Sequence, residues 1–375
     1  MTFPAFVLRH TIVACAFFLL PSLFAAEAPL TERVYLSGHG PSDAVLWDFT
    51  VTGGRRAGEA AKIPVPSNWE LQGFGTYNYG QEQNKSDEHG LYRFTFTPPA
   101  DWRGRRVRLV FDGVMTDAAV KVNGRAAGPV HQGGFTRFRY DVTSLLRPGA
   151  ENTLEVDVAK VSSDPLTERA ERGGDYWVFG GIFRPVWLEA LPVLAIDHVA
   201  IDARADGALT ADVTLGALLT ARPDGLSVVP ERLEAQVIGA DDQPVGAVFS
   251  AKIPAGGTGR LRLAARIESP KLWTAETPNL YRLKVSRVRG SDVVHSVTER
   301  FGFRTFEVRE GDGLYLNGQR ILLKGVNRHS FRPETGRALT REDCYADARL
   351  IRQMNMNAVR MSHYAPDEAF LEACD

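Results

Sequence analysis

Short segments in which apolar and polar residues alternate dominate the first half of the chain. In residues 106–111 (RVRLVF) and 154–158 (LEVDV), apolar side chains recur at every second position. A period of two predicts strands with one buried face. Asn123-Gly124 follows another such segment, and both residues tolerate the positive φ angles of a two-residue hairpin turn. Because no helical periodicity is sustained, residues 29–194 are predicted to form an all-β, jelly-roll-like sandwich.

Alternation continues in a second β segment. Residues 281–285 (YRLKV) alternate in the same way, and turns rich in Pro and Gly bound the segment. Strands and turns over roughly 100 residues are typical of one immunoglobulin-like sandwich, which we expect at residues 195–308. The low-complexity stretch at residues 203–219 is interpreted as a solvated edge of this sandwich.

The pattern changes after residue 308. Residues 321–326 (ILLKGV) are expected to form a strand buried on both faces. Thr340 and Asp343 resemble a capping box, so a helix is expected to begin there. Within it the face formed by 346, 350 and 354 is apolar, with Ile351 beside that face.

A second strand and helix follow. Residues 357–361 (NAVRM) predict the strand, and Pro366 stands where the first position of the next helix would be. Strand, helix, strand, helix is the beginning of a parallel sheet or barrel. A (β/α)8 barrel takes ~250 residues. We therefore expect residues 309–375 to hold only the first two βα units of a truncated TIM barrel, in an N-terminal fragment of a longer protein.

Residues 1–28 have the three-part order of a secretory signal peptide. Arg9 precedes an apolar run at residues 11–24, and alanines follow within residues 25–28. The run is shorter than the ~20 apolar residues that a membrane-spanning helix needs; an anchor and a lipid attachment at Cys15 are the alternatives. We expect cleavage within residues 25–28, export to the periplasm or the outside of the cell, and no membrane association afterwards.

Composition and charge narrow the classes of function. Hydrophobic residues make up 44% and charged residues 24%, as in globular proteins. With 44 Lys and Arg against 45 Asp and Glu, the net charge is -1. No bulk attraction toward nucleic acid or anionic membrane is present, which favours a neutral ligand. Only Cys344 and Cys374 remain after removal of the leader, so a disulfide framework is not expected.

Several motifs occur in an order that is typical of one family. They are residues 65–73 (VPSNWELQG), 175–177 (DYW) with 181–185 (GIFRP), 272–273 (LW) with 276–281 (ETPNLY), 325–329 (GVNRH) and 357–364 (NAVRMSHY). Together they resemble glycoside hydrolase family 2, the β-galactosidase, β-glucuronidase and β-mannosidase family. The Asn-Arg-His form of the fourth motif is more similar to bacterial β-galactosidases than to β-glucuronidases. The resemblance implies the same order of sandwich, immunoglobulin-like sandwich and barrel.

Candidate binding residues follow the two predicted barrel strands. Active sites of βα barrels lie at the C-terminal ends of the strands, where His329, Arg360 and His363 fall. Imidazole and guanidinium groups supply directed hydrogen bonds to sugar hydroxyls. The residues alone favour another reading, in which Arg360 forms a structural ion pair inside the barrel and the histidines are hydrogen-bonded loop groups. The resemblance implies that both histidines bind hydroxyls and that Arg360 orients a catalytic carboxylate; Asn327 joins them as a substrate-binding candidate.

A further candidate lies in the first sandwich. The resemblance implies that Asp175 reaches the sugar and ligates a sodium ion; a turn residue after two glycines is the alternative. Asn84 is the nearest counterpart of a loop asparagine in the sugar site of some relatives, although the spacing around it differs. Trp69, Trp177 and Trp273 are interpreted as core residues.

The resemblance also implies a retaining reaction with two carboxylates ~5–5.5 Å apart. In the family these are glutamates after the fourth and seventh barrel strands, beyond Asp375, so no catalytic residue is assigned here. No cofactor is expected in this chain; Na+ or Mg2+ is left open for the full-length enzyme. The expected partner is a β-linked glycoside, and a homo-oligomer is left open. The alternatives are a β-glucuronidase, a β-mannosidase and a non-catalytic carbohydrate-binding protein.

Overall fold

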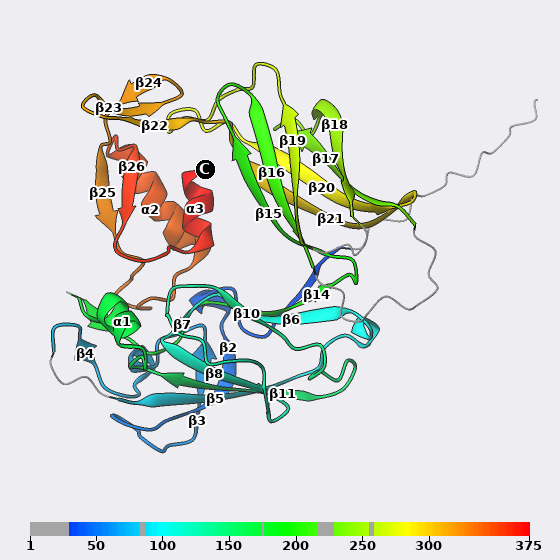
Figure 1. The fold of residues 1–375 in the computed structure, drawn as a ribbon. Helices are drawn as coiled ribbons and strands as arrows, with labels where there is room; N and C mark the ends of the chain where they lie inside the picture. Colours follow the sequence, from blue (N-terminus) through cyan, green and yellow to red (C-terminus); the bar gives the residue numbers. More distant parts are fainter. Residues whose placement is uncertain (1–29, 83–86, 175, 217–228, 255–258) are drawn as a thin grey trace, which may run out of the picture.

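A computed structural model describes residues 30–82, 87–174, 176–216, 229–254 and 259–375 of the chain (Figure 1). The predicted signal peptide lies outside these residues. Two β-sandwiches and a short βα segment follow one another along the sequence. The three-part fold expected from the sequence is confirmed. No helix in the described part of the chain is long and apolar enough to cross a membrane.

The first sandwich has two antiparallel sheets around an apolar core. Its four-stranded sheet has the order β1 (Glu32–Tyr35), β14 (Val186–Leu191), β6 (Arg106–Phe111), β10 (Phe138–Asp141). Its six-stranded sheet has the order β3 (Ala61–Val65), β2 (Val45–Val51), β5 (His89–Phe96), β11 (Asn152–Ala159), β8 (Asp117–Val122), β9 (Arg125–Ala126). Along β11 every second residue is buried, as the alternation predicts. Asn123 and Gly124 have φ angles of 52° and 75° and join β8 to β9, which confirms the predicted hairpin.

Short elements complete the first sandwich. They are the strand pairs β4 (Asn78–Tyr79) with β12 (Trp177–Val178) and β7 (Val114–Met115) with β13 (Gly181–Ile182), the short helical turns Pro41–Asp43, Trp69–Gln72 and Ala100–Trp102, and α1 (Pro165–Thr167), which continues as a π-helical turn, Glu168–Arg172. Helix α1 was not predicted from the sequence, because one turn is too short to show a period of 3.6 residues.

In the described residues the second sandwich has seven strands. Three form one sheet, β15 (Ile196–Ala203), β16 (Ala208–Leu215) and β19 (Gly259–Arg266), and four form the other, in the order β18 (Pro244–Ile253), β17 (Glu231–Ile238), β20 (Tyr281–Arg289), β21 (Asp292–Phe301). For the described part, residues 203–216, the interpretation of residues 203–219 as a solvated edge was wrong, since β16 is the central strand of its sheet and buries Leu209, Ala211 and Val213. Residues 217–219 lie outside the described residues. The alanines and threonines of β16 conceal the alternation, because small side chains carry little hydrophobic contrast.

A meander leads from the second sandwich to the βα segment. It consists of β22 (Phe306–Arg309), β23 (Gly313–Leu316) and β24 (Gln319–Ile321). The expected domain boundary at residue 308 falls within β22. Then β25 (Gly325–Arg328) pairs in parallel with β26 (Ala358–Met361), α2 (Arg341–Gln353) connects them, and α3 (Glu368–Cys374) follows. Thr340 and Asp343 form the predicted capping box, each side chain accepting from the other residue's backbone N–H.

Three local predictions in this segment need correction. Leu322 and Leu323 are 72% and 50% exposed, because parallel pairing begins only at Gly325. In α2 the predicted face at residues 346, 350 and 354 is exposed, while Cys344 and Ile351 are buried in a cluster with Phe370 of α3. Pro366 precedes the helix N-cap, Asp367, instead of occupying the first helical position. Periodicity finds apolar stripes, but tertiary packing selects which one is covered.

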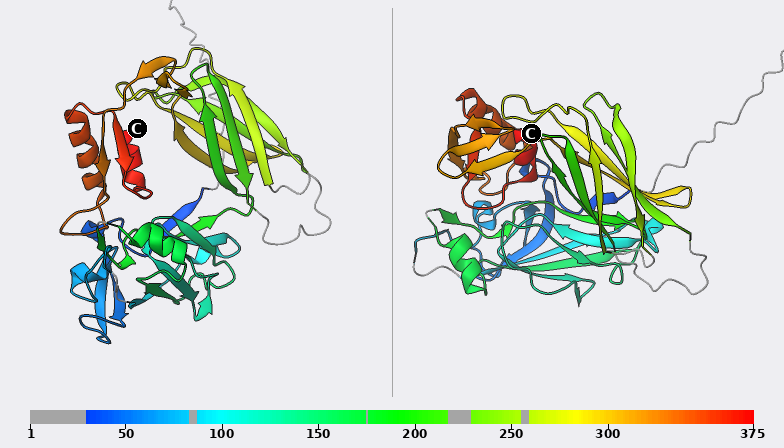
Figure 2. Two further views of the ribbon diagram at one scale, coloured as in Figure 1. Left: turned by 60° about the vertical axis from the view of Figure 1, so that its left-hand side comes forward. Right: turned by 45° about the horizontal axis from the view of Figure 1, so that its top comes forward.

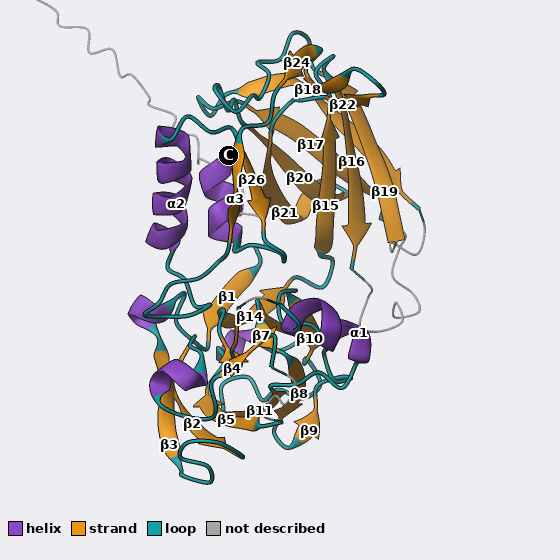
Figure 3. Cartoon of the chain, turned by 90° about the vertical axis from the view of Figure 1, so that its left-hand side faces the viewer, coloured by secondary structure: helices purple, strands orange, loops and turns teal. Residues whose placement is uncertain are grey.

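The βα segment rests on the first sandwich and lies beside the second (Figures 2 and 3). Ala338 packs in an apolar cluster with Phe135, Phe179 and Phe183 of the first sandwich. The buried Arg184 pairs with Asp367 at 3.0 Å, and Arg137 pairs with Glu368 at 2.6 Å. Arg300 of β21 lies 3.6 Å from Glu372 of α3. The first sandwich therefore provides the larger part of the support beneath the strand ends.

Candidate functional site

Parallel pairing of β25 with β26 brings two of the predicted site residues together. Asn327 lies opposite Arg360 in the ladder, and the Arg360 Nη1 atom lies 3.4 Å from the Asn327 Oδ1 atom and 3.4 Å from the Ser362 hydroxyl. Both predicted residues are exposed. No carboxylate among the described residues forms an ion pair with Arg360. Its guanidinium group is therefore available to an acidic group that approaches the strand ends.

The two predicted histidines lie next to each other after the strands. The rings of His329 and His363 are 5.8 Å apart and nearly perpendicular, at 87°. The His329 Nδ1 atom lies 3.3 Å from the Tyr364 hydroxyl. The pKa of His329 is lowered by desolvation and by the positive charges of Arg337 and of His363. A neutral imidazole at this place favours hydrogen bonding over charge interaction with a ligand.

The arginine in the middle of the Asn-Arg-His motif has a different role. Arg328 is 6% exposed, pairs with Asp347 of α2 at 2.8 Å and lies 4.0 Å above the Phe370 ring of α3. It holds β25 to both helices. Alternation along the strand therefore sends Asn327 outward and Arg328 into the packed interior.

The first sandwich contributes aromatic side chains to the same neighbourhood. The Tyr176 ring lies 6.3 Å from the His329 ring, and Arg337 lies 5.2 Å above Tyr176. Trp177 is 47% exposed and contacts Tyr77 and Tyr79 edge-on, so its assignment to the core was wrong. The reason is that its strand, β12, has two residues and pairs with the equally short β4.

The other two tryptophans that were interpreted as core residues differ in burial. Trp69 is fully buried, as predicted, whereas Trp273 is only partly buried beneath the Arg304 guanidinium at 5.0 Å.

Asp175 and Asn84 lie outside the described residues, so their predicted contacts with the sugar and with sodium stay predictions. The parts of the chain that the structure describes contain no group of three His, Cys, Asp or Glu side chains that could hold a metal ion.

Two residues of the site were missed by sequence reasoning. Tyr364 stands in the quoted Ser-His-Tyr motif, yet its hydroxyl contacts were not foreseen. Arg337 is 3% exposed, follows Gly336 in a tight turn and donates a hydrogen bond to the Tyr364 hydroxyl. The available signal was the glycine, since Gly336 has a φ of 62° and a Cβ atom there would lie 2.6 Å from Asn68 Oδ1.

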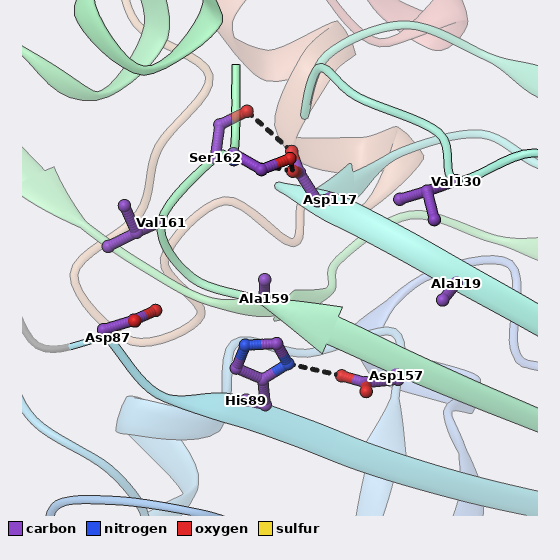
Figure 4. Close-up of a pocket in the computed structure, with 10 residues that line it drawn as sticks. Asp87, His89, Asp117, Ala119, Val130, Asp157, Ala159, Val161 and Ser162 are labelled. Atoms are coloured by element: carbon purple, nitrogen blue, oxygen red, sulfur yellow. Dashed lines mark hydrogen bonds and ion pairs between the residues drawn. The ribbon is translucent and has the colours of Figure 1, made fainter. Parts of the chain in front are cut away.

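A separate cavity of about 430 Å³ lies on the outer face of β5, β11 and β8, away from the βα segment (Figure 4). His89 pairs with Asp157 at 2.6 Å across its floor. Asp117, at its rim, accepts hydrogen bonds from the hydroxyls of Ser162 and Ser163, both at 2.7 Å. These polar groups brace the sheet and the loop after β11, and we assign no binding role to them.

Each of the three parts of the chain matches a known domain family. Residues 55–192 match "Glycosyl hydrolases family 2, sugar binding domain", residues 194–304 match "Glycosyl hydrolases family 2", and residues 306–375 match "Glycosyl hydrolases family 2, TIM barrel domain". A β-galactosidase of Priestia megaterium is 33% identical over 336 residues, which cover 84% of this chain and 31% of that protein.

Relatives of another specificity are similar to the chain as well. A protein of Formosa agariphila named "Putative beta-glucuronidase" is 35% identical over 272 residues, which cover 72% of this chain and 31% of that protein. The crystal structure of a Bacteroides uniformis β-glucuronidase superposes with a TM-score of 0.74 at 25% identity, over 92% of this chain and 41% of that one. The chain thus spans about a third of the length of these curated relatives.

Proposed function

This chain belongs to glycoside hydrolase family 2, and on that premise we propose that it provides sugar-binding residues of a retaining exo-β-glycosidase that hydrolyses terminal β-galactosides. The observation that carries the proposal is the meeting of the two motifs across the β25–β26 ladder. An amide, a guanidinium group and two imidazoles gather at the C-terminal ends of two parallel strands. This set of uncharged and cationic donors suits the hydroxyls of a neutral sugar.

In the proposed reaction the residues of this chain bind and orient. His329 and His363 hydrogen-bond sugar hydroxyls, and contacts that strengthen in the transition state raise the rate constant. A carboxylate that approaches the strand ends would meet the guanidinium group of Arg360, which favours the ionised form of the acid. An ionised carboxylate is what the nucleophile of a retaining glycosidase must be, while its partner, ~5–5.5 Å away, protonates the leaving oxygen. Neither carboxylate is assigned to a residue of this chain.

Two features support galactosides over glucuronides as substrates. One is the Asn-Arg-His form of the motif at residues 327–329, and the other is the predicted place of Asp175, whose charge would repel a uronic carboxylate. A β-glucuronidase is the second candidate. It is favoured by the names of the Formosa and Bacteroides relatives and by the positive charge that Arg337 brings near His329.

The test is an assay of the full-length protein, meaning this chain with the barrel that follows it, on matched aryl β-glycosides. We expect kcat/KM to be highest for the galactoside, ahead of the glucuronide and the mannoside. A glucuronide that is hydrolysed faster would make the second candidate correct. Sugar binding without hydrolysis of any glycoside would instead identify a non-catalytic carbohydrate-binding protein.

Export is proposed from residues 1–28 alone. The mature protein is expected in the periplasm or outside the cell, with its first residue within or directly after residues 25–28. N-terminal sequencing of the protein recovered from those compartments checks this. An intact leader in the cytoplasmic fraction would contradict it.

A further inference from the structure

The Tyr364 hydroxyl has three hydrogen-bonding neighbours. Arg337 Nη1 and the backbone N–H of Ser330, at 3.1 Å, can only donate to it. The third neighbour is His329 Nδ1, at 3.3 Å. A hydroxyl has two acceptor positions and one hydrogen. Because Arg337 and Ser330 occupy both acceptor positions, the hydrogen of Tyr364 is left for His329 Nδ1.

Arg337 is held in place from both sides of a domain contact. Its guanidinium group lies 4.7 Å above the Tyr364 ring and 5.2 Å above the Tyr176 ring, distances that suit cation–π attraction. Its backbone N–H donates to Asn68 Oδ1 at 2.8 Å, and the Asn68 amide donates in turn to the Gly180 carbonyl at 2.9 Å. The arginine therefore cannot leave Tyr364 without breaking contacts with the first sandwich.

We propose that Arg337 and Tyr364 are positioning residues that fix His329 in one neutral tautomer, with its hydrogen on Nε2. Nδ1 accepts from Tyr364, so Nε2–H is the group that His329 offers to a ligand. Toward the proposed sugar, His329 is then a hydrogen-bond donor, and the sugar oxygen that meets it is an acceptor. The identity of this ligand rests on the proposed function, whereas the tautomer does not.

The charges around the two side chains agree with this assignment. Burial raises the pKa of Tyr364, so the phenol keeps the proton that it donates. The lowered pKa of His329 keeps the imidazole neutral, as an Nδ1 acceptor requires. If Nδ1 were instead the donor, the Tyr364 oxygen would have to accept three hydrogen bonds, one more than it has positions for.

Nitrogen NMR of the 375-residue chain with labelled imidazoles tests the tautomer directly. We expect His329 Nδ1 to resonate as an unprotonated nitrogen and Nε2 as a protonated one. In Tyr364→Phe the share of the tautomer with hydrogen on Nδ1 should rise, while the Phe ring keeps the stacking at 4.0 Å on Phe135. His295 serves as the internal control, because its Nδ1 accepts from the Ile196 N–H at 2.9 Å, far from Tyr364 along the chain.

The outcomes separate the inference from the proposed function. A hydrogen on Nδ1 of His329 in the unaltered chain, or a tautomer that Tyr364→Phe leaves unchanged, overturns the inference. Should Tyr364→Phe also disturb the His295 signals, Arg337→Met replaces it, since Met keeps the stem and removes the donor.

In the full-length protein Tyr364→Phe should lower kcat for the aryl galactoside about tenfold, the effect of ~1.4 kcal/mol. A changed tautomer with unaltered kcat would contradict the sugar contact and leave the tautomer standing.

Discussion

Each of the two sandwiches buries a salt bridge, but the partners of the two bridges differ. In the first sandwich Lys160 lies 2.7 Å from Glu70 and 3.2 Å from Glu88, and all three side chains are fully buried. In the second, Arg287 of β20 pairs with Glu231 of the neighbouring strand β17 at 2.6 Å. The first bridge joins the end of β11 to the helical turn Trp69–Gln72, whereas the second joins two adjacent strands of one sheet.

The first bridge leads toward the candidate site. Glu70 accepts a hydrogen bond at 2.9 Å from the backbone N–H of Gly180, and Asn68, two residues before it, binds both Gly180 and Arg337. Burying charge costs several kcal/mol per ion, which packing alone could avoid. We infer that the buried bridge of the first sandwich fixes the loop after Tyr176 against the βα segment, and that this contact offsets the cost of burying the charges.

The largest effect is expected from breaking the first bridge. Lys160→Met leaves two carboxylates buried without their cation, which should lower the free energy of unfolding by about 3–5 kcal/mol. Urea unfolding followed by circular dichroism measures this. Lys62→Met is the matched control, because Lys62 and Asp48 form an exposed pair whose loss should be barely measurable. Equal stability of both variants would contradict the assigned role of Lys160.

Acid should affect the two sandwiches in opposite directions. Burial lowers the pKa of His295 to about 4, below the unfolded value of 6.5. The unfolded chain therefore binds the extra proton, and the second sandwich should lose about 2–3 kcal/mol as the pH falls from 6.5 to 4. Burial raises the pKa of Glu70 to about 7, so the folded first sandwich takes up a proton first and gains stability between pH 7 and 4.5.

Unfolding curves at several pH values, with separate probes for the two sandwiches, check these signs. His295→Asn retains an acceptor for the Ile196 N–H and should flatten the acid loss of the second sandwich. If the stability of both sandwiches changed with pH in the same direction, His295 and Glu70 would not both determine the pH dependence of their domains.

A smaller effect is expected at the strand ends. His329→Ala should lower turnover of the full-length protein about tenfold or more, the factor that ~1.4 kcal/mol implies. Its melting temperature should stay nearly unchanged, because the side chain is exposed. His89→Ala, in the outer cavity, should leave turnover unaltered. Early melting with normal turnover would assign His329 a structural role.

The smallest effect concerns the exposed tryptophan. Trp177→Ala should change the stability of the chain little, whereas Trp69→Ala should cost about 3–5 kcal/mol, as large core truncations do. Thermal melts of the two variants give the comparison. Similar losses for both would mean that Trp177 is part of the core after all.

Structural features that depend on residues close together in the sequence could be predicted from it. Alternation identified strands such as β11, Asn123-Gly124 located a hairpin, and Thr340 with Asp343 located the start of α2. These signals are local, since each is contained within a few consecutive residues.

Contacts between distant segments left no such signal. The bond between Asn68 and Arg337 spans 269 residues, and nothing in either local sequence specifies the other. The same holds for the buried side of α2 and for the exposure of Trp177, which depend on the surfaces that meet them. Motif resemblance named His329, Arg360 and His363 as candidates, and their roles stay predictions, whereas the contacts of Arg337 and Tyr364 with His329 became visible only in the structure.

The most direct test of the account compares two buried asparagines of the first sandwich. Asn68 reaches Gly180 and Arg337; Asn152, equally buried, bonds to Arg147 and Ala150 at the other end of the domain. Each alanine variant leaves buried backbone groups unpaired and should lose about 1–3 kcal/mol of stability. Measured on the aryl galactoside in the full-length protein below both melting temperatures, kcat/KM should fall at least about tenfold for Asn68→Ala and stay unchanged for Asn152→Ala. Full activity of a folded Asn68→Ala, or equal losses in the two variants, would contradict the claim that the first sandwich shapes the site.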